Sequence, residues 1–251
     1  MTEPMIQQNP DGSTTVVSIN DRDTVAESIA RISSTTESLI GDFSNAANIS
    51  IEVPADVRSL LSSAVRDITA TLGKVDVAVA MAAGYRANDT MFPAGRERLA
   101  TAEIAKADSE VTAALDSAED KLTVAEADLY LAARPAMPAG GDMAARADVR
   151  MILDGVSPSQ LADRIKGLAQ RGDAAGALVA DGAWLDMYLS SRGVESDMAD
   201  AIKALVKDQV FRSAAASGEP KRAAAGRTAL ALVHLRKAGI AARSYRRTKL
   251  S

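Results

Sequence analysis

The stretch PAGRERLATAEIAKADSEVTAALDSAEDKLTVAEADLYLAAR, residues 93–134, decides the fold. One set of its residues recurs every seven positions, and a second set recurs at the complementary position of the heptad, as in a coiled coil. Alanine on one side of this seam lets a partner helix approach closely. The sequence predicts one long helix whose seam closes against another helix of the same chain or of another subunit. The first set is Ile104, Val111, Ala118, Ala125 and Ala132; the second is Asp108, Leu115, Leu122 and Leu129.

Composition extends the helical prediction to the whole chain. Alanine supplies 50 of the 251 residues, whereas Phe, Trp and Tyr together supply eight. Alanine is the best helix former, and strands favour aromatic and β-branched residues. A helix of about forty residues is roughly 60 Å long, which exceeds what a compact globule of this size needs. We therefore expect an all-α fold, an elongated helical bundle built around the long helix.

Residues 21–134 are predicted to form the elongated domain. A helical stripe begins at Asp21 and includes Val25, Ile29 and Ile32, and we expect it to end near Gly41. A second helix is predicted from Pro54, a residue suited to the first helical position, to about Ala83.

Residues 1–20 differ from the rest and predict a short β-hairpin. Asn9-Pro10-Asp11-Gly12 is a strong turn signal, and the β-branched run 13–19 follows it. A lone two-stranded hairpin is marginal in water, so we expect this arm to dock on helices of its own chain or on another subunit.

Residues 135–141 are the predicted linker, because they combine two prolines with a pair of glycines. Beyond it, residues 142–239 are expected to form a smaller helical domain. Ser157 and Asp181 are predicted helix caps, and Trp184 and Tyr188 lie one turn apart in its core.

Positive charge is concentrated at the end of the chain. Residues 220–251 contain nine Lys and Arg and no Asp or Glu, whereas the whole chain has 29 basic and 33 acidic residues and a net charge of −4. We predict that a helix from about Pro220 ends at Gly239 in a left-handed cap, followed by a basic arm, residues 240–251.

Such asymmetry points to a contact with a polyanion or an acidic protein surface. Docking on an acidic subunit surface, contact with nucleic-acid phosphates and a merely solubilising tail stay open as readings of this segment. The candidate partner-binding or nucleic-acid-binding residues are Lys221, Arg222, Arg227, Arg236, Lys237, Arg243, Tyr245, Arg246, Arg247 and Lys249.

No pattern of residues indicates catalysis, a metal site or a cofactor. His234 is the only histidine, it lies within an apolar turn of the last predicted helix, and no Gly-x-Ser-x-Gly elbow accompanies it. The chain has no cysteine, and one histidine cannot supply the two Glu-x-x-His pairs of a di-iron bundle. We expect a non-enzymatic protein without cofactors.

The N-terminus lacks the features of a signal peptide, and no apolar run approaches the ~20 residues of a membrane span, so we expect a soluble cytoplasmic protein. The N-terminal hairpin, the alanine-rich helix, the lack of cysteine and the basic end together resemble tailed-bacteriophage virion and assembly proteins. This resemblance implies a scaffolding, connector or minor capsid subunit that assembles with itself or with capsid and portal-like proteins, first in the host cytoplasm and then in the virion. The alternative is a nucleic-acid-binding accessory protein that uses residues 220–251.

Overall fold

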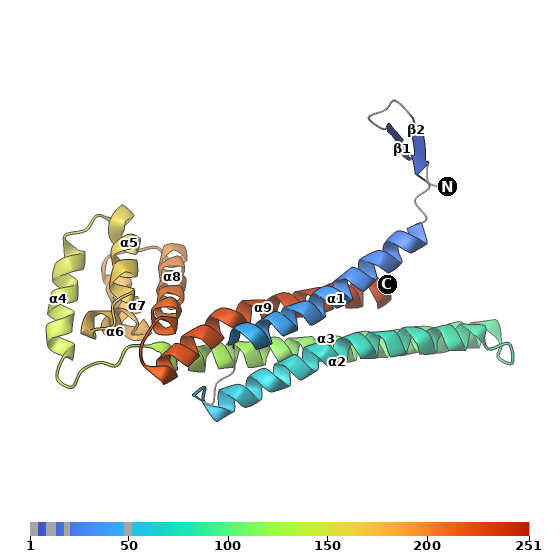
Figure 1. Cartoon of the computed structure of the whole chain (residues 1–251), viewed down its shortest axis with the longest axis horizontal. Helices are drawn as coiled ribbons and strands as arrows, with labels where there is room; N and C mark the ends of the chain where they lie inside the picture. Colours follow the sequence, from blue (N-terminus) through green and yellow to red (C-terminus); the bar gives the residue numbers. More distant parts are fainter. Residues whose placement is uncertain (1–4, 9–13, 18–20, 48–51, 251) are drawn as a thin grey trace. The chain divides into compact units, whose positions relative to one another are not determined.

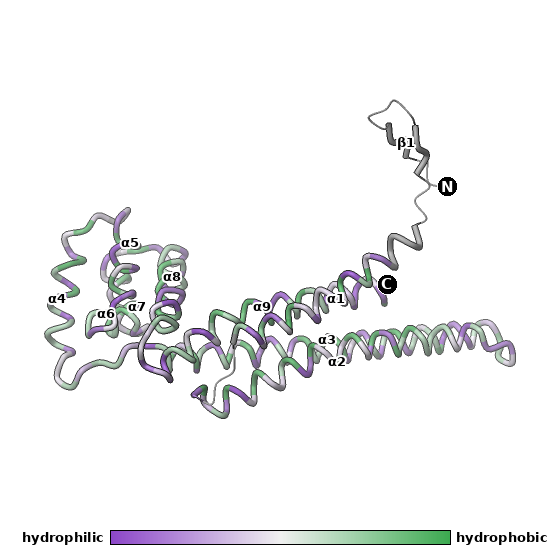
Figure 2. The backbone as a smooth tube through the Cα atoms, viewed as in Figure 1, coloured by the Kyte–Doolittle hydropathy of each residue, from purple (hydrophilic) through white to green (hydrophobic). Residues whose placement is uncertain are grey.

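The computed structural model describes residues 5–8, 14–17, 21–47 and 52–250 (Figure 1). Residues 21–47 and 52–250 form an all-α fold, as expected, and Figure 2 shows hydrophobic and hydrophilic positions alternating along the helices. The helices are α1 (Asp21–Ala47), α2 (Ala55–Ala87), α3 (Pro93–Ala133), α4 (Asp142–Asp154), α5 (Pro158–Ala169), α6 (Ala174–Val179), α7 (Gly182–Ser191), α8 (Ser196–Ala215) and α9 (Pro220–Leu250).

Two short strands precede the helices. β1 (Met5–Gln8) and β2 (Thr14–Val17) pair antiparallel, with Met5 opposite Val17. The predicted turn at residues 9–12 lies outside the described residues. The hairpin as a docking arm therefore stays a prediction, and the helices alone carry the fold class.

The chain forms two compact units. Unit 1 comprises Met1–Leu39, Arg66–Asp116 and Lys237–Ser251, and unit 2 comprises Ile40–Val65 and Ser117–Arg236. Helices α1, α2, α3 and α9 each contribute one part to each unit. The predicted linker, residues 135–141, is non-helical and lies within unit 2.

The core of unit 1 is thin, because small side chains supply most of it. Tyr245 is the only aromatic residue among its fully buried side chains in the part of the chain that the structure describes. Small residues let helices approach closely, so this unit is held by short-range packing along helix faces. The buried residues come from α2 (Ile68, Thr71, Leu72, Val75, Ala78 and Ala82), α3 (Ala100, Ala107, Val111 and Leu115), α9 (Ala238, Ala242 and Tyr245) and α1 (Thr36).

The core of unit 2 contains larger side chains. Asp173 and Asp181 cap α6 and α7 by accepting hydrogen bonds from backbone amides of the first turn, which confirms the predicted cap at Asp181. Trp184 stacks on Tyr188 with ring centroids 5.2 Å apart, and both are buried as expected. Helix α6 was not predicted. The largest fully buried side chains here include Leu122, Leu129, Leu153, Leu161, Ile165, Leu178, Leu185, Leu189 and Leu232.

Six of the nine residues predicted for the seam on α3 are buried, and the other three are half-buried. The six, each at most 2% exposed, are Val111, Leu115, Ala118, Leu122, Ala125 and Leu129; the three are Ile104, Asp108 and Ala132. The buried positions 107, 111, 115, 118, 122, 125, 129 and 133 follow steps of four more often than a strict heptad does. The stripe therefore keeps the 3.6-residue period of a straight helix. Segments of the same chain cover it.

The predicted end of the last helix at Gly239 is wrong. Helix α9 continues to Leu250, so residues 240–250 are not a free arm. Its buried face continues without interruption through Leu235, Ala238, Ala242 and Tyr245. A glycine within a helix costs about 1 kcal/mol, which is less than burial of a large side chain such as Tyr245 contributes. For the same reason α1 passes through Gly41, because Phe43 beyond it is buried. Helix α2 also continues through Gly84, where we expected its end.

Candidate interaction surfaces

Arg236 of α9 lies over acidic side chains of α3. Its Nη2 donates to Glu126 Oε2 at 2.8 Å, and its Nε donates to Glu119 Oε1 at 3.2 Å. Lys207 Nζ lies 2.9 Å from Glu126 Oε1, and the Glu126 side chain is only 15% exposed. Burial raises the pKa of the Glu126 carboxyl, but the hydrogen bonds from Arg236 and Lys207 together lower it by more, so its pKa lies below the ordinary range. This carboxylate is held charged between two cations.

Two further arginines of α9 meet acidic residues of α3 within unit 1. Arg243 Nη1 lies 2.8 Å from Asp116 Oδ1, and Arg246 Nη1 lies 3.4 Å from Asp108 Oδ1. Arg246 also donates to Thr112 Oγ1. Both carboxylates are at least half exposed, so solvent and salt screen these pairs strongly.

The end of α9 is fixed to α2 at Asp76. The Tyr245 hydroxyl donates to Asp76 Oδ1 at 2.6 Å, and Lys249 Nζ lies 3.1 Å from the same oxygen. Lys249 Nζ also lies 5.6 Å from the centroid of the Tyr245 ring, within the range of a cation–π contact. Burial raises the pKa of the Tyr245 hydroxyl, and the hydrogen bond to the Asp76 carboxylate raises it further.

At the other end of α9, Arg222 caps the C-terminus of α3. Its Nε donates to the Ala133 carbonyl at 2.8 Å, and its Nη2 donates to Ser213 Oγ at 3.3 Å. A guanidinium at this position satisfies a carbonyl that no helical amide can reach.

The remaining four basic candidates, Lys221, Arg227, Lys237 and Arg247, are exposed. None of them pairs with a carboxylate among the described residues. At 100° per residue they point to four different sides of α9, so they do not form a stripe. Six of the ten predicted binding residues thus engage groups of their own chain, and binding of an external partner through this segment stays a prediction.

The loop between α2 and α3 presents Phe92, whose exposed fraction is 88%. Arg96 holds this loop: its Nε donates to the Met91 carbonyl at 2.9 Å, and its Nη1 lies 3.1 Å from Asp89 Oδ1. Asn88 Oδ1 accepts hydrogen bonds from the amide and hydroxyl of Thr90. The loop is therefore organised around an aromatic side chain that contacts little of its own chain.

An ion pair joins α2 to α3 next to this loop. Arg86 donates two hydrogen bonds to the Glu97 carboxylate, at 2.9 and 3.0 Å. The hydrogen bond from Arg86 lowers the pKa of Glu97. Sequence reasoning missed Phe92; the signal was an aromatic residue in a polar turn of a chain that has only eight aromatics.

The outward face of α2 in unit 1 is the second apolar surface. Val77 is 58% exposed and Met81 is 42% exposed. Beside them lies a groove of about 330 Å³ between α2 and α3. Residues 75–84 are nearly all apolar in the sequence. Helical periodicity identified only the face of this run that packs in the core, and it did not identify the exposed apolar face. The groove residues are Ala70, Gly73, Lys74, Val77, Ala78, Glu103, Lys106, Ala107 and Glu110.

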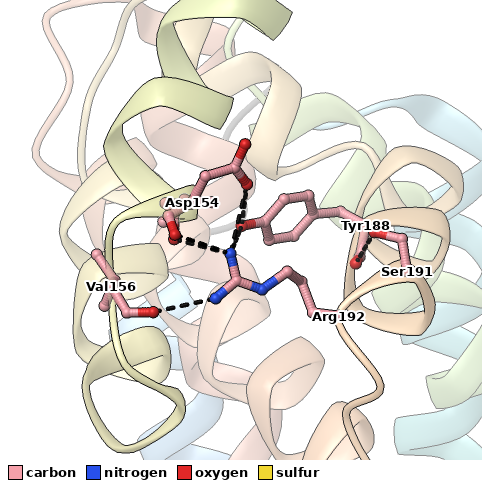
Figure 3. A network of polar contacts seen from close by, with 6 residues as sticks. Asp154, Val156, Tyr188, Ser191 and Arg192 are labelled. Atoms are coloured by element: carbon pink, nitrogen blue, oxygen red, sulfur yellow. Dashed lines mark hydrogen bonds and ion pairs between the residues drawn. The ribbon is translucent and has the colours of Figure 1, made fainter.

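The most connected polar cluster of unit 2 caps a helix (Figure 3). Arg192 Nη1 donates to the Leu153 and Asp154 carbonyls at the end of α4, and its Nη2 donates to the Val156 carbonyl at 3.0 Å. The Tyr188 hydroxyl donates to Asp154 Oδ1 at 3.2 Å. The two terminal nitrogens of Arg192 and the Tyr188 hydroxyl all have acceptors within the cluster, which is the arrangement of a structural helix cap.

Unit 2 also has an open hollow of about 510 Å³ at the start of α4. Its charged groups pair with one another, Arg134 with Asp181 and Arg146 with Asp142. His234 Nδ1 is buried and accepts or donates no hydrogen bond among the described residues. Within the same residues no three His, Asp or Glu side chains gather as a metal ion would require.

Comparison with known proteins finds no family model, curated protein or solved structure that matches this chain. Over the described residues, no helix combines the length and apolar character needed to cross a bilayer. The surfaces described above are therefore the basis for a functional proposal.

Proposed function

We propose that this chain is a non-enzymatic structural subunit of a larger assembly and that Phe92 is one of its contact residues. The observation that supports this proposal is the difference in solvent exposure between Phe92 and the other aromatic residues. Phe92 is 88% exposed, whereas the other seven aromatic residues are buried or half-buried.

Physical chemistry favours Phe92 as an anchor for a partner. Full burial of such a side chain contributes roughly 1.5–3 kcal/mol. Aromatic residues that enter a partner's pocket commonly dominate the energy of an interface. Because Arg96 already orders the loop, little conformational entropy remains to be lost on binding.

The resemblance to tailed-bacteriophage assembly proteins makes a phage particle the first assembly to consider. In that setting the chain would be a scaffolding, connector or minor capsid component, present in the host cytoplasm and then in the virion. The alanine-rich helices and the exposed apolar residues of the α2–α3 hairpin support a protein partner, either a second copy or another subunit.

The nucleic-acid alternative receives less support from the geometry. Arg236, Arg243 and Arg246 already contact carboxylates of their own chain, and a phosphate would have to displace those contacts. If the alternative holds, a DNA duplex of arbitrary sequence binds with a steep salt dependence, and charge removal at Lys237 and Arg247 weakens that binding.

Sedimentation velocity over a concentration series tests the proposal. We expect the wild-type chain to form a discrete oligomer and Phe92→Ser to lower its mass or shift its formation to higher concentration. Met151→Ser is the matched control, because Met151 is 76% exposed on α4. A wild-type chain that stays monomeric throughout, or an oligomer that Phe92→Ser leaves unchanged, would overturn the proposal.

A further inference from the structure

The end of α9 leaves a pocket on the hairpin formed by α2 and α3. Lys249 lies beside Asp76, whereas α2 continues to Ala87, so the tip of the hairpin extends beyond the last turn of α9. A pocket of about 260 Å³ lies where α9 stops. All three helices supply its apolar walls, which are Val79, Ala82, Ile104 and Leu250.

The rim of this pocket favours an aromatic occupant. Arg86 and Lys249 line the pocket beside its apolar walls, and a cation attracts the face of an aromatic ring whose centroid lies within about 6 Å. Lys249 already makes such a contact with the Tyr245 ring, at 5.6 Å. The volume is sufficient, because an apolar cavity of about 150 Å³ holds benzene. The pocket therefore has the size and the charge to bind a phenyl ring.

Phe92 is the aromatic side chain that is available to fill such a pocket. It is 88% exposed, whereas the other seven aromatic residues are buried or half-buried. Because it is exposed and does not line the pocket, it does not fill the pocket of its own chain. Asp89, whose side chain is 94% exposed, accompanies Phe92 and brings a carboxylate toward the two cations of the rim.

The two cations of the rim already have partners within the chain. Arg86 pairs with Glu97, and Lys249 pairs with Asp76. A further carboxylate at the rim therefore orients an incoming loop more than it strengthens its binding. Burial of the phenyl ring supplies most of the affinity.

We propose that two copies of this chain bind by a two-fold exchange, in which Phe92 of each copy enters the pocket of the other. At 1.5 Å per residue, Thr101 at the pocket lies about 12 Å along α3 from the residue that follows Phe92. Two antiparallel hairpins that overlap by this length seat both rings at once. The neutral Arg86–Glu97 pair lies midway along the overlap. One surface serves both copies, as a two-fold interface requires.

This inference rests on the proposed role of Phe92 in assembly, and it names the partner and the site that Phe92 enters. Phe92→Ser removes the ring, and Thr101→Trp fills the pocket from an exposed position. Burial of one ring corresponds to about tenfold to a hundredfold in affinity. Each variant alone loses both contacts of the dimer. Sedimentation velocity should therefore show each variant associating about a hundredfold or more weakly than wild type.

An equal mixture of the two variants tests the exchange directly. One contact survives in the mixture, because Phe92 of the Thr101→Trp copy enters the open pocket of the Phe92→Ser copy. With a fluorescent label on one variant, sedimentation should reveal a heterodimer that is about tenfold to a hundredfold weaker than the wild-type dimer. Neither variant should form a dimer at that concentration by itself.

Two further variants keep the test independent of folding. Ser109→Trp places the same side chain at an exposed position of α3 that does not line the pocket, and it should dimerise as wild type does. Leu250→Ser removes one wall of the pocket at the last residue of α9, and it should weaken the dimer without adding bulk. Circular dichroism should give the wild-type helix content for all four variants.

The other outcomes separate the inference from the proposed function. An oligomer that Phe92→Ser abolishes but Thr101→Trp and Leu250→Ser leave intact would refute the inference and leave the proposed function standing. Two variants that fail to associate even when mixed would also refute the inference, because direct contact between two Phe92 rings behaves in that way. A wild-type chain that stays monomeric, or an oligomer that is insensitive to Phe92→Ser, would overturn both.

Discussion

The Tyr245 hydroxyl donates a 2.6 Å hydrogen bond to Asp76 Oδ1, and this bond joins the end of α9 to the middle of α2. Asp76 also receives Lys249. The last turns of α9, which the sequence presents as a basic tail, are thereby part of the folded structure of unit 1.

Tyr245→Phe should loosen the end of α9 without removing the buried ring. The variant loses a hydrogen bond to a charged acceptor, for which the expected cost is about 1.5–3 kcal/mol. Amide hydrogen exchange within residues 237–250 should become faster by a corresponding factor. Tyr130→Phe is the control, because it removes a hydroxyl that donates to the Ala180 carbonyl in unit 2 and should leave exchange in residues 237–250 unchanged. Equal exchange in both variants would mean that the Tyr245–Asp76 bond contributes nothing.

The same hydroxyl predicts a loss of stability in alkali. Burial and the hydrogen bond to Asp76 raise the pKa of Tyr245 in the folded protein. A raised pKa contributes stability that is fully present below the unfolded value of about 10 and is lost as the pH rises above it. Hydrogen exchange is too fast there, so the readout is the circular dichroism melting temperature between pH 9 and 11, which should fall more steeply for wild type than for Tyr245→Phe.

Salt should weaken the end of α9 selectively. The pairs Arg243–Asp116 and Arg246–Asp108 have half-exposed carboxylates, and the screening length falls from about 10 Å at 0.1 M to about 3 Å at 1 M salt. We expect exchange in residues 237–250 to accelerate with NaCl, whereas exchange near Arg236, whose partner Glu126 is 15% exposed, changes less. If NaCl accelerated amide exchange equally along the whole of α9, the predicted difference between residues 237–250 and the region near Arg236 would be contradicted.

Glu126→Gln should remove an acid-sensitive contribution to stability. The pKa of Glu126 is lowered in the folded chain, so its contribution is present above the ordinary Glu value of about 4.3 and is lost as the pH falls through the lower folded value. At neutral pH the variant should be less stable by about 2 kcal/mol, because the amide removes the negative charge and one of the two oxygens that accept from Arg236 and Lys207. Urea unfolding measures this difference, and the free energies of unfolding of wild type and Glu126→Gln should converge as the pH is lowered from 7 to 3. A difference between the two proteins that stays constant from pH 7 to pH 3 would contradict the prediction.

The all-α class and the cap at Asp181 could be predicted from the sequence, because they depend on local propensity and periodicity. Helix α6 could not, and Ser157 stands at the N-cap of α5 without a capping hydrogen bond from its side chain. The path of α9 could not be predicted either. Gly239 followed by an exposed Ile240 fits a helix end, and only the burial of Ala242 and Tyr245 by other segments carries the helix past it. Local signals contain no information about that coverage.

The candidate interaction surfaces could not be predicted from the sequence either, and the reason is physical. Charge content located the basic segment. Whether Arg243 or Arg236 is available to bind a partner, however, depends on carboxylates more than a hundred residues away in the chain. In α2 the run 75–84 is apolar on two faces, and composition does not tell which face the chain itself covers.

Two glycines of α9 provide the sharpest test of the packing. A Cβ at Gly226 would collide with the Ala215 amide nitrogen and lie 2.6 Å from the Phe211 carbonyl oxygen, whereas a Cβ at Gly239 would meet nothing within 4 Å. Both residues lie inside the same helix, so alanine gains about the same helix propensity at each, up to about 1 kcal/mol. Gly239→Ala should therefore stabilise the chain by that amount. Gly226→Ala should destabilise it by about 3 kcal/mol or more, because backbone atoms of α8 cannot move aside as a side chain can. Urea unfolding monitored by circular dichroism measures both differences, and equal effects at the two positions would mean that α8 and α9 do not pack at backbone distance.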